Sequence, residues 1–312
     1  MTAQPRPAAP NILCVGMPVR DLVFRVENLP ARGNKMRATH FTEYSGGNAL
    51  NASIAIARLG GRVLMSGPMG HAGEKAAEQI FEDLAQEGID GSAMVQMPGL
   101  VTPISNIMID HAGERTIVTY RDPEMWNVTL PDTDELLKGC DAVLTESRCG
   151  FVSGLCFEAK QRGIPVVLDA DRVMPLDEAL LRASTHIVFS AEALHATAGS
   201  EDDVAALRTI AALTPAFVGV TNGAGGMIWL EGRNVRHMDA FPIAAVDTLG
   251  AGDVFHGAFT LAIAEGQNID QAMRFSAAAA ALKCTRHGGA FGSPQRIEVE
   301  AFLTKSAARQ PA

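Results

Sequence analysis

The sequence predicts an α/β protein: a doubly wound, mostly parallel sheet flanked by helices, with a small antiparallel sheet as a lid. Three observations support this. Short apolar runs alternate with amphipathic helical segments along most of the chain, which is typical of parallel sheets. Two further pairs of strand-like segments have no helix between them. The 312 residues, 47% of them hydrophobic, can bury a large core without disulfides or a structural metal.

The main sheet is predicted from four short apolar runs, at residues 12–16, 141–146, 164–169 and 216–221. Helical segments alternate with them, at about residues 72–86, 152–161, 202–212 and 252–265. Asn268 and Gln271 have the spacing of a capping box, which predicts that a helix begins there and continues to residue 283. The pair Gly60-Gly61 predicts the end of another helix, because glycine adopts a left-handed C-cap readily.

The lid is predicted from strand-like segments at residues 22–26 and 36–43, and from two more at 105–109 and 116–121 that flank a turn signal. We expect an antiparallel sheet from about residues 17–44 and 102–122 that closes over the site. Its unpaired edges predict a homodimer formed through the lid. We find no repeat or linker, so residues 11–312 are predicted to be one domain, preceded by a disordered tail at residues 1–10.

Composition excludes several classes of function. The net charge is −9, and no long run of Lys or Arg marks a nucleic-acid surface. No apolar stretch reaches the roughly 18 residues that span a membrane, and the first residues lack the apolar region of a signal peptide. Five scattered cysteines without a CxxC pair indicate a reducing compartment. We therefore expect a cytoplasmic enzyme.

The segment Val246–Phe255 carries the strongest chemical signal. Gly250 and Gly252 precede an apolar helical run, so backbone amides can converge on an anion at the start of a helix. Asp253 lies in the first turn, where a carboxylate would repel phosphate unless it accepts a proton from an attacking hydroxyl. The alternative is that Asp253 is only a helix-terminal acid and the glycines only form a turn.

A second segment, which follows Gly46 and Gly47, places Asn48 and Asn51 on one face of a helix near its start. Paired carboxamides offer both donors and acceptors, as neutral sugar hydroxyls require. The alternative, that Asn48 caps the helix, explains one asparagine and leaves the second unexplained.

These two segments carry a family resemblance. GGNALNASIAIARLGG at residues 46–61 and DTLGAGDVFHGAF at residues 247–259 resemble the two signatures of the ribokinase-like (PfkB) sugar kinases. The resemblance implies a sheet of nine or so strands, ATP and Mg²⁺ as cofactors, and phosphorylation of a sugar alcohol. It also implies that Asp253 is the base and that the amides of Gly250, Ala251 and Gly252 form an anion hole.

The resemblance extends to other positions. Substrate contacts are expected from Asp21, Gly47, Asn48, Asn51 and Arg148. Arg148 ends a predicted core strand, where ligands bind in open α/β sheets, although an arginine there is more often a solvated charge. Nucleotide contacts are expected from Thr221, Gly223, Gly226, Thr248, Ala279, Lys283 and Gly288. The alternative is a purely structural role, in which the glycine-rich segment only forms a hairpin turn and the helix only packs in the core.

Within the family, the chain looks like ketohexokinases and, more closely, bacterial sulfofructose kinases, which DVFHGA and ALKCTRHGG resemble. Two departures are visible. Thr119 stands where the sulfofructose kinases carry an asparagine, and the family's NxxE box is reduced to residues 190–193, with Glu192 one position early. No metal ligand is therefore assigned, and Mg²⁺ is expected to be held mainly through ATP and water. K⁺ is a further option, in a loop near Asp247 and residues 288–292.

We therefore predict an ATP-dependent kinase that transfers the γ-phosphoryl group to a primary hydroxyl of a ketose-like sugar. Sulfofructose kinase and nucleoside kinase are the alternatives within the same fold. A catalytically silent sugar sensor is the alternative from another class, and the intact Asp253 disfavours it. A dinucleotide-dependent dehydrogenase is set aside, because VGMPVR at residues 15–20 lacks the GxGxxG pattern.

Overall fold

The computed structural model describes residues 9–307, and a nine-stranded sheet forms its centre. The strand order is β13-β12-β11-β10-β9-β8-β1-β4-β5, and only β12 runs opposite to the other strands, because its pairs with β11 and β13 are antiparallel. The predicted doubly wound, mostly parallel sheet is thereby confirmed. Its strands are β1 (Asn11–Val15), β4 (Arg62–Met69), β5 (Asp90–Gln96), β8 (Ala142–Glu146), β9 (Val166–Ala170), β10 (His186–Ser190), β11 (Phe217–Thr221), β12 (Met227–Glu231) and β13 (Asn234–Met238).

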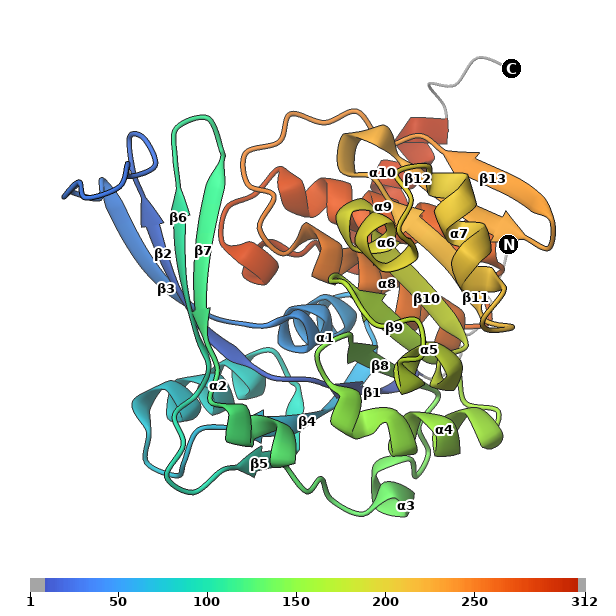
Figure 1. Ribbon diagram of the computed structural model, residues 1–312, viewed down its shortest axis with the longest axis horizontal. Coiled ribbons are helices and arrows are strands. Elements are labelled where there is room, and N and C mark those ends of the chain that lie inside the picture. The colour runs from blue at the N-terminus through green and yellow to red at the C-terminus, as the bar shows by residue number, and fades with distance from the viewer. Residues whose placement is uncertain (1–8, 308–312) are drawn as a thin grey trace.

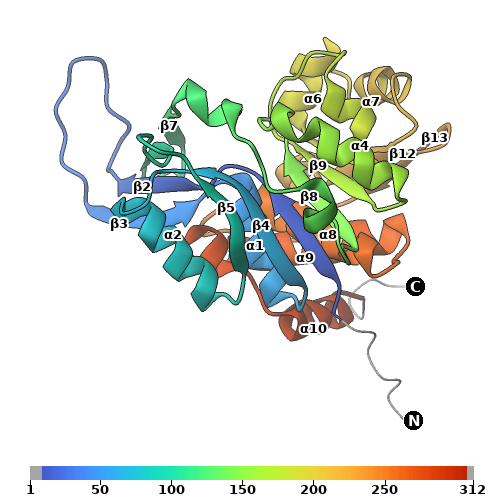
Figure 2. The same cartoon turned by 90° about the horizontal axis from the view of Figure 1, so that it is seen from below.

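Helices cover both faces of this sheet (Figures 1 and 2). The helices fall into two sets, and the first set packs its apolar side chains on one face: α1 (Asn48–Arg58), α2 (Lys75–Gln86), α8 (Ala251–Ala264), α9 (Ile269–Cys284) and α10 (Arg296–Ala307). The second set packs on the other: α3 (Thr133–Leu136), α4 (Ser153–Gln161), α5 (Ala179–Ala183), α6 (Ala191–Ala198) and α7 (Asp203–Ala211). The core therefore has two halves, one on each face of the sheet.

Sequence and structure agree closely where the local signals are strong. Alternate residues of β1 face opposite halves of the core, since Ile12 and Cys14 pack on one side and Leu13 on the other. The capping box forms as predicted, because the Asn268 side chain accepts from the Gln271 amide and the Gln271 side chain from the Asn268 amide. The φ of Gly60 is +100°, the left-handed conformation that the glycine pair predicts after α1.

A second, four-stranded sheet stands at one side of the main sheet (Figure 1), and we call it the lid sheet. Its order is β3-β2-β6-β7, built from β2 (Val19–Arg25), β3 (His40–Gly46), β6 (Ile104–Ile109) and β7 (Arg115–Tyr120). The two outer pairs are antiparallel as predicted, whereas the central pair β2–β6 is parallel. The reason lies in the main sheet: β2 follows β1 and β6 follows β5, and β1 and β5 run in the same direction.

The lid sheet has an inner face that meets the end of the main sheet. Directly paired residues point to the same face, so Asp21, Tyr44 and Ser105 share one side with Val23 and Ile107. Val23 and Ile107 form a small apolar cluster that Leu249 joins from the loop before α8. The predicted tail falls largely on residues 1–8, which lie outside the described residues. Within residues 9–307, no helix is both long and apolar enough to cross a membrane.

Candidate active site

The N-terminus of α8 is the centre of the site. Gly250 adopts φ +77°, a left-handed conformation that turns the chain from the loop into the helix. The Ala251 amide is bonded to the Thr248 carbonyl at 3.2 Å. First-turn amides of a helix have no partner within it and carry partial positive charge, so they can stabilise an anion. The anion hole expected at Gly250, Ala251 and Gly252 stays a prediction, and the Ala251 amide has the Thr248 carbonyl as its partner.

Asp253 lies in the first turn of α8, and a side chain of α1 holds it by a hydrogen bond. The Asn51 side chain donates to Asp253 Oδ2 at 2.6 Å. Burial raises the pKa of Asp253 to about 8; repulsion from Asp169 adds to this, and the bond from Asn51 opposes it. A carboxylate whose pKa is near neutrality is well matched to accepting a proton from an alcohol. The segments at residues 46–61 and 247–259 therefore meet at one point.

The start of α1 depends on a glycine. Gly47 precedes the helix with φ +97°, and a Cβ added there would lie 2.4 Å from the Met17 carbonyl oxygen. Gly47 is the N-cap, so the alternative interpretation of Asn48 as a cap is wrong. The Asn48 side chain instead donates to Asp169 Oδ2 at 3.0 Å. Both asparagines thus point at carboxylates of the site.

Asp21 lies on β2 and is the predicted site residue that the lid sheet contributes. Burial raises the pKa of Asp21 to about 6, while a hydrogen bond from Ser105 and the charge of Arg121 oppose the shift. A Cβ on Gly46 would lie 2.1 Å from Asp21 Oδ2, so the carboxylate fits only against a glycine. Thr119 pairs with Ser105 and therefore shares the inner face with Asp21.

Arg148 follows β8, as predicted, and lies among acids. Its Nη2 is 3.6 Å from Asp171 Oδ2, and among the described residues its buried Nε has no hydrogen-bond partner. Glu146, at the end of β8, is buried and accepts from the Met17 amide at 2.8 Å. Burial raises the pKa of Glu146 and of Asp169.

Sequence reasoning missed four of these residues: Arg121, Glu146, Asp169 and Asp171. Glu146, Asp169 and Asp171 lie at or just past the ends of the neighbouring parallel strands β8 and β9. That position was a usable signal, because ligands bind at the carboxyl edge of open α/β sheets. Arg121 follows the last strand of the lid sheet and had no such signal. Burial and the charge of Arg148 lower the pKa of Arg121, and its buried Nε also has no partner among the described residues.

The predicted nucleotide residues divide into three groups: a turn, two loops and a pair on α9. Thr221, Gly223 and Gly226 form the turn between β11 and β12, where a Cβ on Gly226 would lie 2.3 Å from the Met238 carbonyl oxygen. Exposed Thr248 and half-buried Gly288 lie in the loops that flank Asp247.

Ala279 and Lys283 lie on α9 in the interior of the protein. Both side chains are fully buried, Ala279 in the hydrophobic core and Lys283 beside Asp247. Neither exposes side-chain surface, so the nucleotide contacts expected of these two residues have no support in the structure and stay a prediction.

The reduced NxxE box has a structural use. The Ser190 hydroxyl caps α6 by accepting from the Ala193 amide at 3.4 Å, and Glu192 is exposed. Within residues 9–307, no three His, Cys, Asp or Glu side chains gather into a group that could hold a metal ion.

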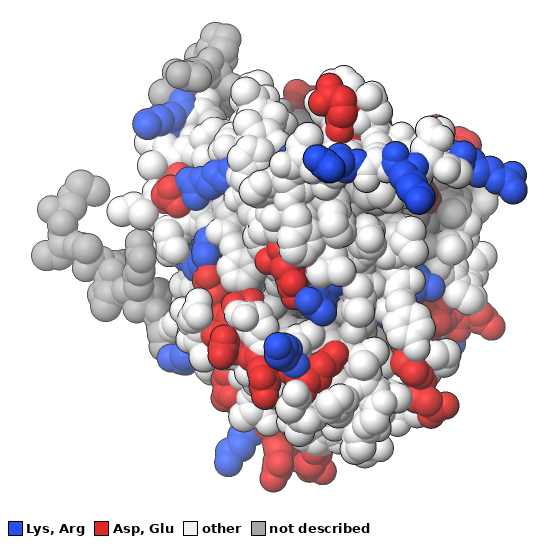
Figure 3. Space-filling model, turned by 90° about the vertical axis from the view of Figure 1, so that its left-hand side faces the viewer, with Lys and Arg blue, Asp and Glu red and all other residues white. Residues whose placement is uncertain are grey.

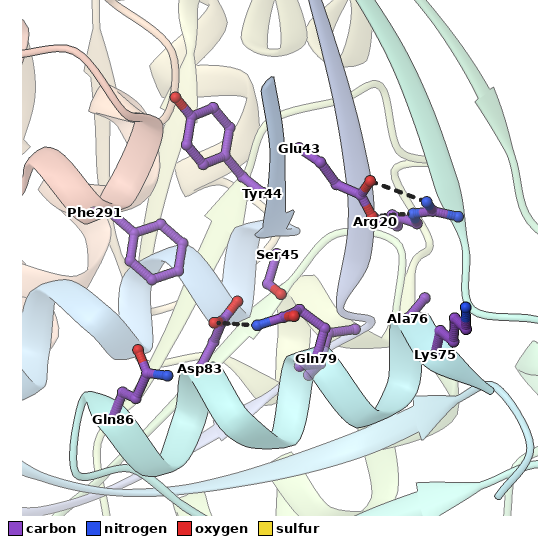
Figure 4. Close-up of a pocket in the computed structure, with 11 residues that line it drawn as sticks. Arg20, Glu43, Tyr44, Ser45, Lys75, Ala76, Gln79, Asp83, Gln86 and Phe291 are labelled. Carbon is purple, nitrogen blue, oxygen red and sulfur yellow. Dashed lines mark hydrogen bonds and ion pairs between the residues drawn. The ribbon is translucent and has the colours of Figure 1, made fainter. Parts of the chain in front are cut away.

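A pocket of about 680 Å³ lies apart from these residues, between β3, α2 and Phe291 (Figure 4). Polar groups on its wall satisfy one another: Arg20 pairs with Glu43, and Gln79 donates to Asp83 at 3.0 Å. None of the predicted site residues is among those that line it. The pocket is therefore separate from the candidate active site.

The fold and the site together define a kinase that phosphorylates a small alcohol. Residues 9–296 match the family model described as "pfkB family carbohydrate kinase". The chain belongs to this family, and it is a phosphotransferase with an alcohol group as acceptor.

Individual relatives agree with this assignment. The chain is 28% identical to the ribokinase of Bacillus subtilis over 94% of its length and 99% of that protein. It is 26% identical to mouse ketohexokinase over 89% of its length and 97% of that protein. A crystal structure from Agrobacterium tumefaciens, described as a candidate ribokinase, superposes with a TM-score of 0.91 at 36% identity, covering 97% of this chain and 100% of that one. The names of these relatives refer to different sugars.

Proposed function

We propose that this chain transfers the γ-phosphoryl group of ATP to a primary hydroxyl of a neutral, ketose-like sugar. One observation carries the proposal: Asp253, with its pKa raised to about 8, lies 2.6 Å from Asn51 in the first turn of α8. A carboxylate so placed is within reach both of an alcohol proton and of the phosphoryl group that the alcohol attacks.

The remaining groups have complementary roles in this proposal. Asp21, Asn48 and Asn51 bind and orient the hydroxyls of the sugar, and Asp253 takes the proton of the attacking one. First-turn amides of α8 stabilise the charge that develops on the transferred group. Mg²⁺ bound to ATP would neutralise phosphate charge. Closure of the lid sheet excludes water, which would otherwise accept the phosphoryl group.

Charge at the site favours a neutral sugar. Five acidic side chains belong to it, Asp21, Glu146, Asp169, Asp171 and Asp253, against two guanidinium groups. Burial raises the pKa of Asp21, Glu146, Asp169 and Asp253, so the excess of acidic groups is larger than the excess of negative charge. An anionic sugar would have to enter beside this excess of acids.

A second candidate is a sugar that carries a sulfonate or phosphate. It is favoured by Arg121 and Arg148, whose buried Nε atoms have no partner among the described residues. Arginine binds such anions through two parallel hydrogen bonds.

The experiment is a panel of fructose, ribose, sulfofructose and nucleosides in an assay coupled to ADP release. We expect kcat/KM to be highest for a neutral ketose. Efficient turnover of sulfofructose with negligible turnover of fructose would establish the second candidate. ATP consumption with no phosphorylated product from any member of the panel would contradict the neutral-sugar proposal.

A further inference from the structure

Lys283 is a buried cation that the proposed transfer does not use. It lies in the last turn of α9 with 0% of its surface exposed. Its Nζ donates to the Asp247 main-chain carbonyl at 2.9 Å and lies 3.7 Å from Asp247 Oδ1. Burial lowers the pKa of Lys283, and the charge of Asp247 opposes the shift. A buried ammonium is costly unless it is paired, so its position requires an explanation.

Asp247 holds together the loop in front of the anion hole. Its carboxylate accepts from the Leu249 amide at 2.9 Å and from the Gly288 amide at 3.3 Å. The Asp247 amide also donates to the Cys284 carbonyl at 3.2 Å. The Asp247 carboxylate thus fixes the loop before α8 and the loop after α9, and Lys283 is its buried counter-charge.

The other charges that face this carboxylate are more distant. Arg25 Nη2 and His287 Nδ1 lie 3.9 and 4.0 Å from Asp247 Oδ2, and both side chains are partly exposed. Ala251, the first residue of α8, follows two positions after Leu249. A shift of Asp247 would therefore move the amides and the base at the start of that helix.

The position of the Lys283 ammonium bears on the K⁺ option raised by the sequence. K⁺ binds to carbonyl and carboxylate oxygens, and at Asp247 a primary ammonium already contacts the carbonyl and faces the carboxylate. The residues present therefore do not fit a K⁺ ion at this point. We propose that Lys283 is a tethered cation, a positioning residue that sets the Asp247 loop and makes the kinase independent of monovalent metal ions. This inference rests on the proposed function only where kinase rates are measured.

The first test uses the unmodified protein. Rates are compared in potassium, sodium and tetramethylammonium chloride at equal ionic strength. We expect kcat to agree within about twofold among the three salts. A stimulation of about fivefold or more by potassium would overturn the proposal.

The second test removes the ammonium. In tetramethylammonium chloride, Lys283→Ala should lower kcat by about tenfold or more and leave the sugar KM within about twofold, because the loop and not the sugar site is disturbed. Potassium or methylammonium, which fit the vacated space, should restore kcat by about fivefold or more. Lys283→Met fills that space without charge, so it should lose activity that no cation restores. Unchanged kcat in either variant, or a folded alanine variant that no cation restores, would refute a tethered cation.

A third measurement needs no substrate and serves if the kinase assay itself fails. Potassium should raise the Tm of Lys283→Ala above its value in tetramethylammonium chloride, because an ion that binds only the folded state stabilises it. Neither the unmodified protein nor the control Lys305→Ala, at an exposed position of α10, should show this difference. Equal responses of all three proteins would overturn the proposal. If no sugar is phosphorylated but this Tm difference is seen, the proposed function fails and the cation site stands.

Discussion

Asp253 combines two properties at the scale of a single residue: a position at a helix N-terminus and a contact with Asn51. Asp253→Asn keeps size and hydrogen bonding but removes proton acceptance. We expect kcat to fall by about 10²–10⁴-fold with nucleotide binding retained, measured by steady-state kinetics and by calorimetry. Asp270→Asn is the matched control, since Asp270 is also a first-turn acid, of α9, and lies on the surface. A near-normal rate in the Asp253 variant would refute its assignment as base.

The raised pKa of Asp253 predicts a pH dependence. Only the ionised carboxylate accepts a proton, so kcat/KM should rise with pH until about 8, the pKa of Asp253, and then level off. A profile that is flat between pH 6 and pH 8 would show that another group limits the rate.

The same shift predicts an effect on stability. The folded protein binds more protons than the unfolded chain between the ordinary pKa of 3.8 and the folded value of about 8, so stability from this group is lost as the pH rises through that window. Asp253→Asn removes the buried charge, and we expect it to raise the free energy of unfolding at pH 8 by about 0.5–2 kcal/mol. Denaturant titrations at pH 5 and pH 8 check this, and the gain should be smaller at pH 5.

Arg148 decides between the neutral and the anionic substrate. If the substrate is a neutral ketose, Arg148→Met should change its KM by less than about threefold. If an anion is bound, the loss of a charge-assisted contact should raise KM by about 10- to 100-fold. We expect the smaller change, because Arg148 already lies near Asp171 and has a counter-charge without a ligand.

At the scale of elements, the start of α1 depends on Gly47. Gly47→Ala would place a Cβ 2.4 Å from the Met17 carbonyl oxygen and would force a left-handed alanine, so we expect a loss of about 1–3 kcal/mol. The sugar KM should rise as well, since Asn48 and Asn51 follow directly. Gly154→Ala is the control, because Gly154 lies inside α4 with open space around it and should be neutral or stabilising. Equal stabilities for the two variants would contradict this account.

The elements also show how far the sequence could be interpreted without a structure. Local signals were sufficient for the capping box at Asn268, the turn after α1 and the glycine-rich start of α8. The parallel pairing of β2 with β6 was beyond them, because it depends on two strands of the main sheet that are far apart in the chain. The contact of Lys283 with Asp247 was missed for a similar reason, because only tertiary structure places the two residues side by side.

At the scale of the whole molecule, the lid sheet predicts association. Its outer face carries Phe41, Val118 and Tyr120, which are 50%, 62% and 54% exposed. Figure 3 looks onto this side of the molecule and shows a largely uncharged area bordered by charged side chains. Strands β3 and β7 also end the sheet with unpaired edges among the described residues. A second copy of the chain would cover both features.

We therefore expect a dimer at micromolar concentration, measured by light scattering coupled to size exclusion. Val118→Lys places a charge on the outer face and should yield monomers. Ile297→Lys is the control: Ile297 is 74% exposed on α10, away from the lid sheet, and its replacement should leave the dimer intact. A monomeric unmodified protein would remove the dimer and leave the kinase assignment unaffected.

The position of β1 has a consequence for how the protein is made. This strand leaves the ribosome before the other described strands, yet it lies inside the main sheet, with Ile12 paired to Val63 on one side and to Ala142 on the other. During synthesis the second edge of β1 stays open until β8 has been translated. Contacts between residues so distant in the chain slow folding. Nascent chains that end before β8 therefore expose an apolar strand edge, and they are the species that chaperones would have to protect from aggregation.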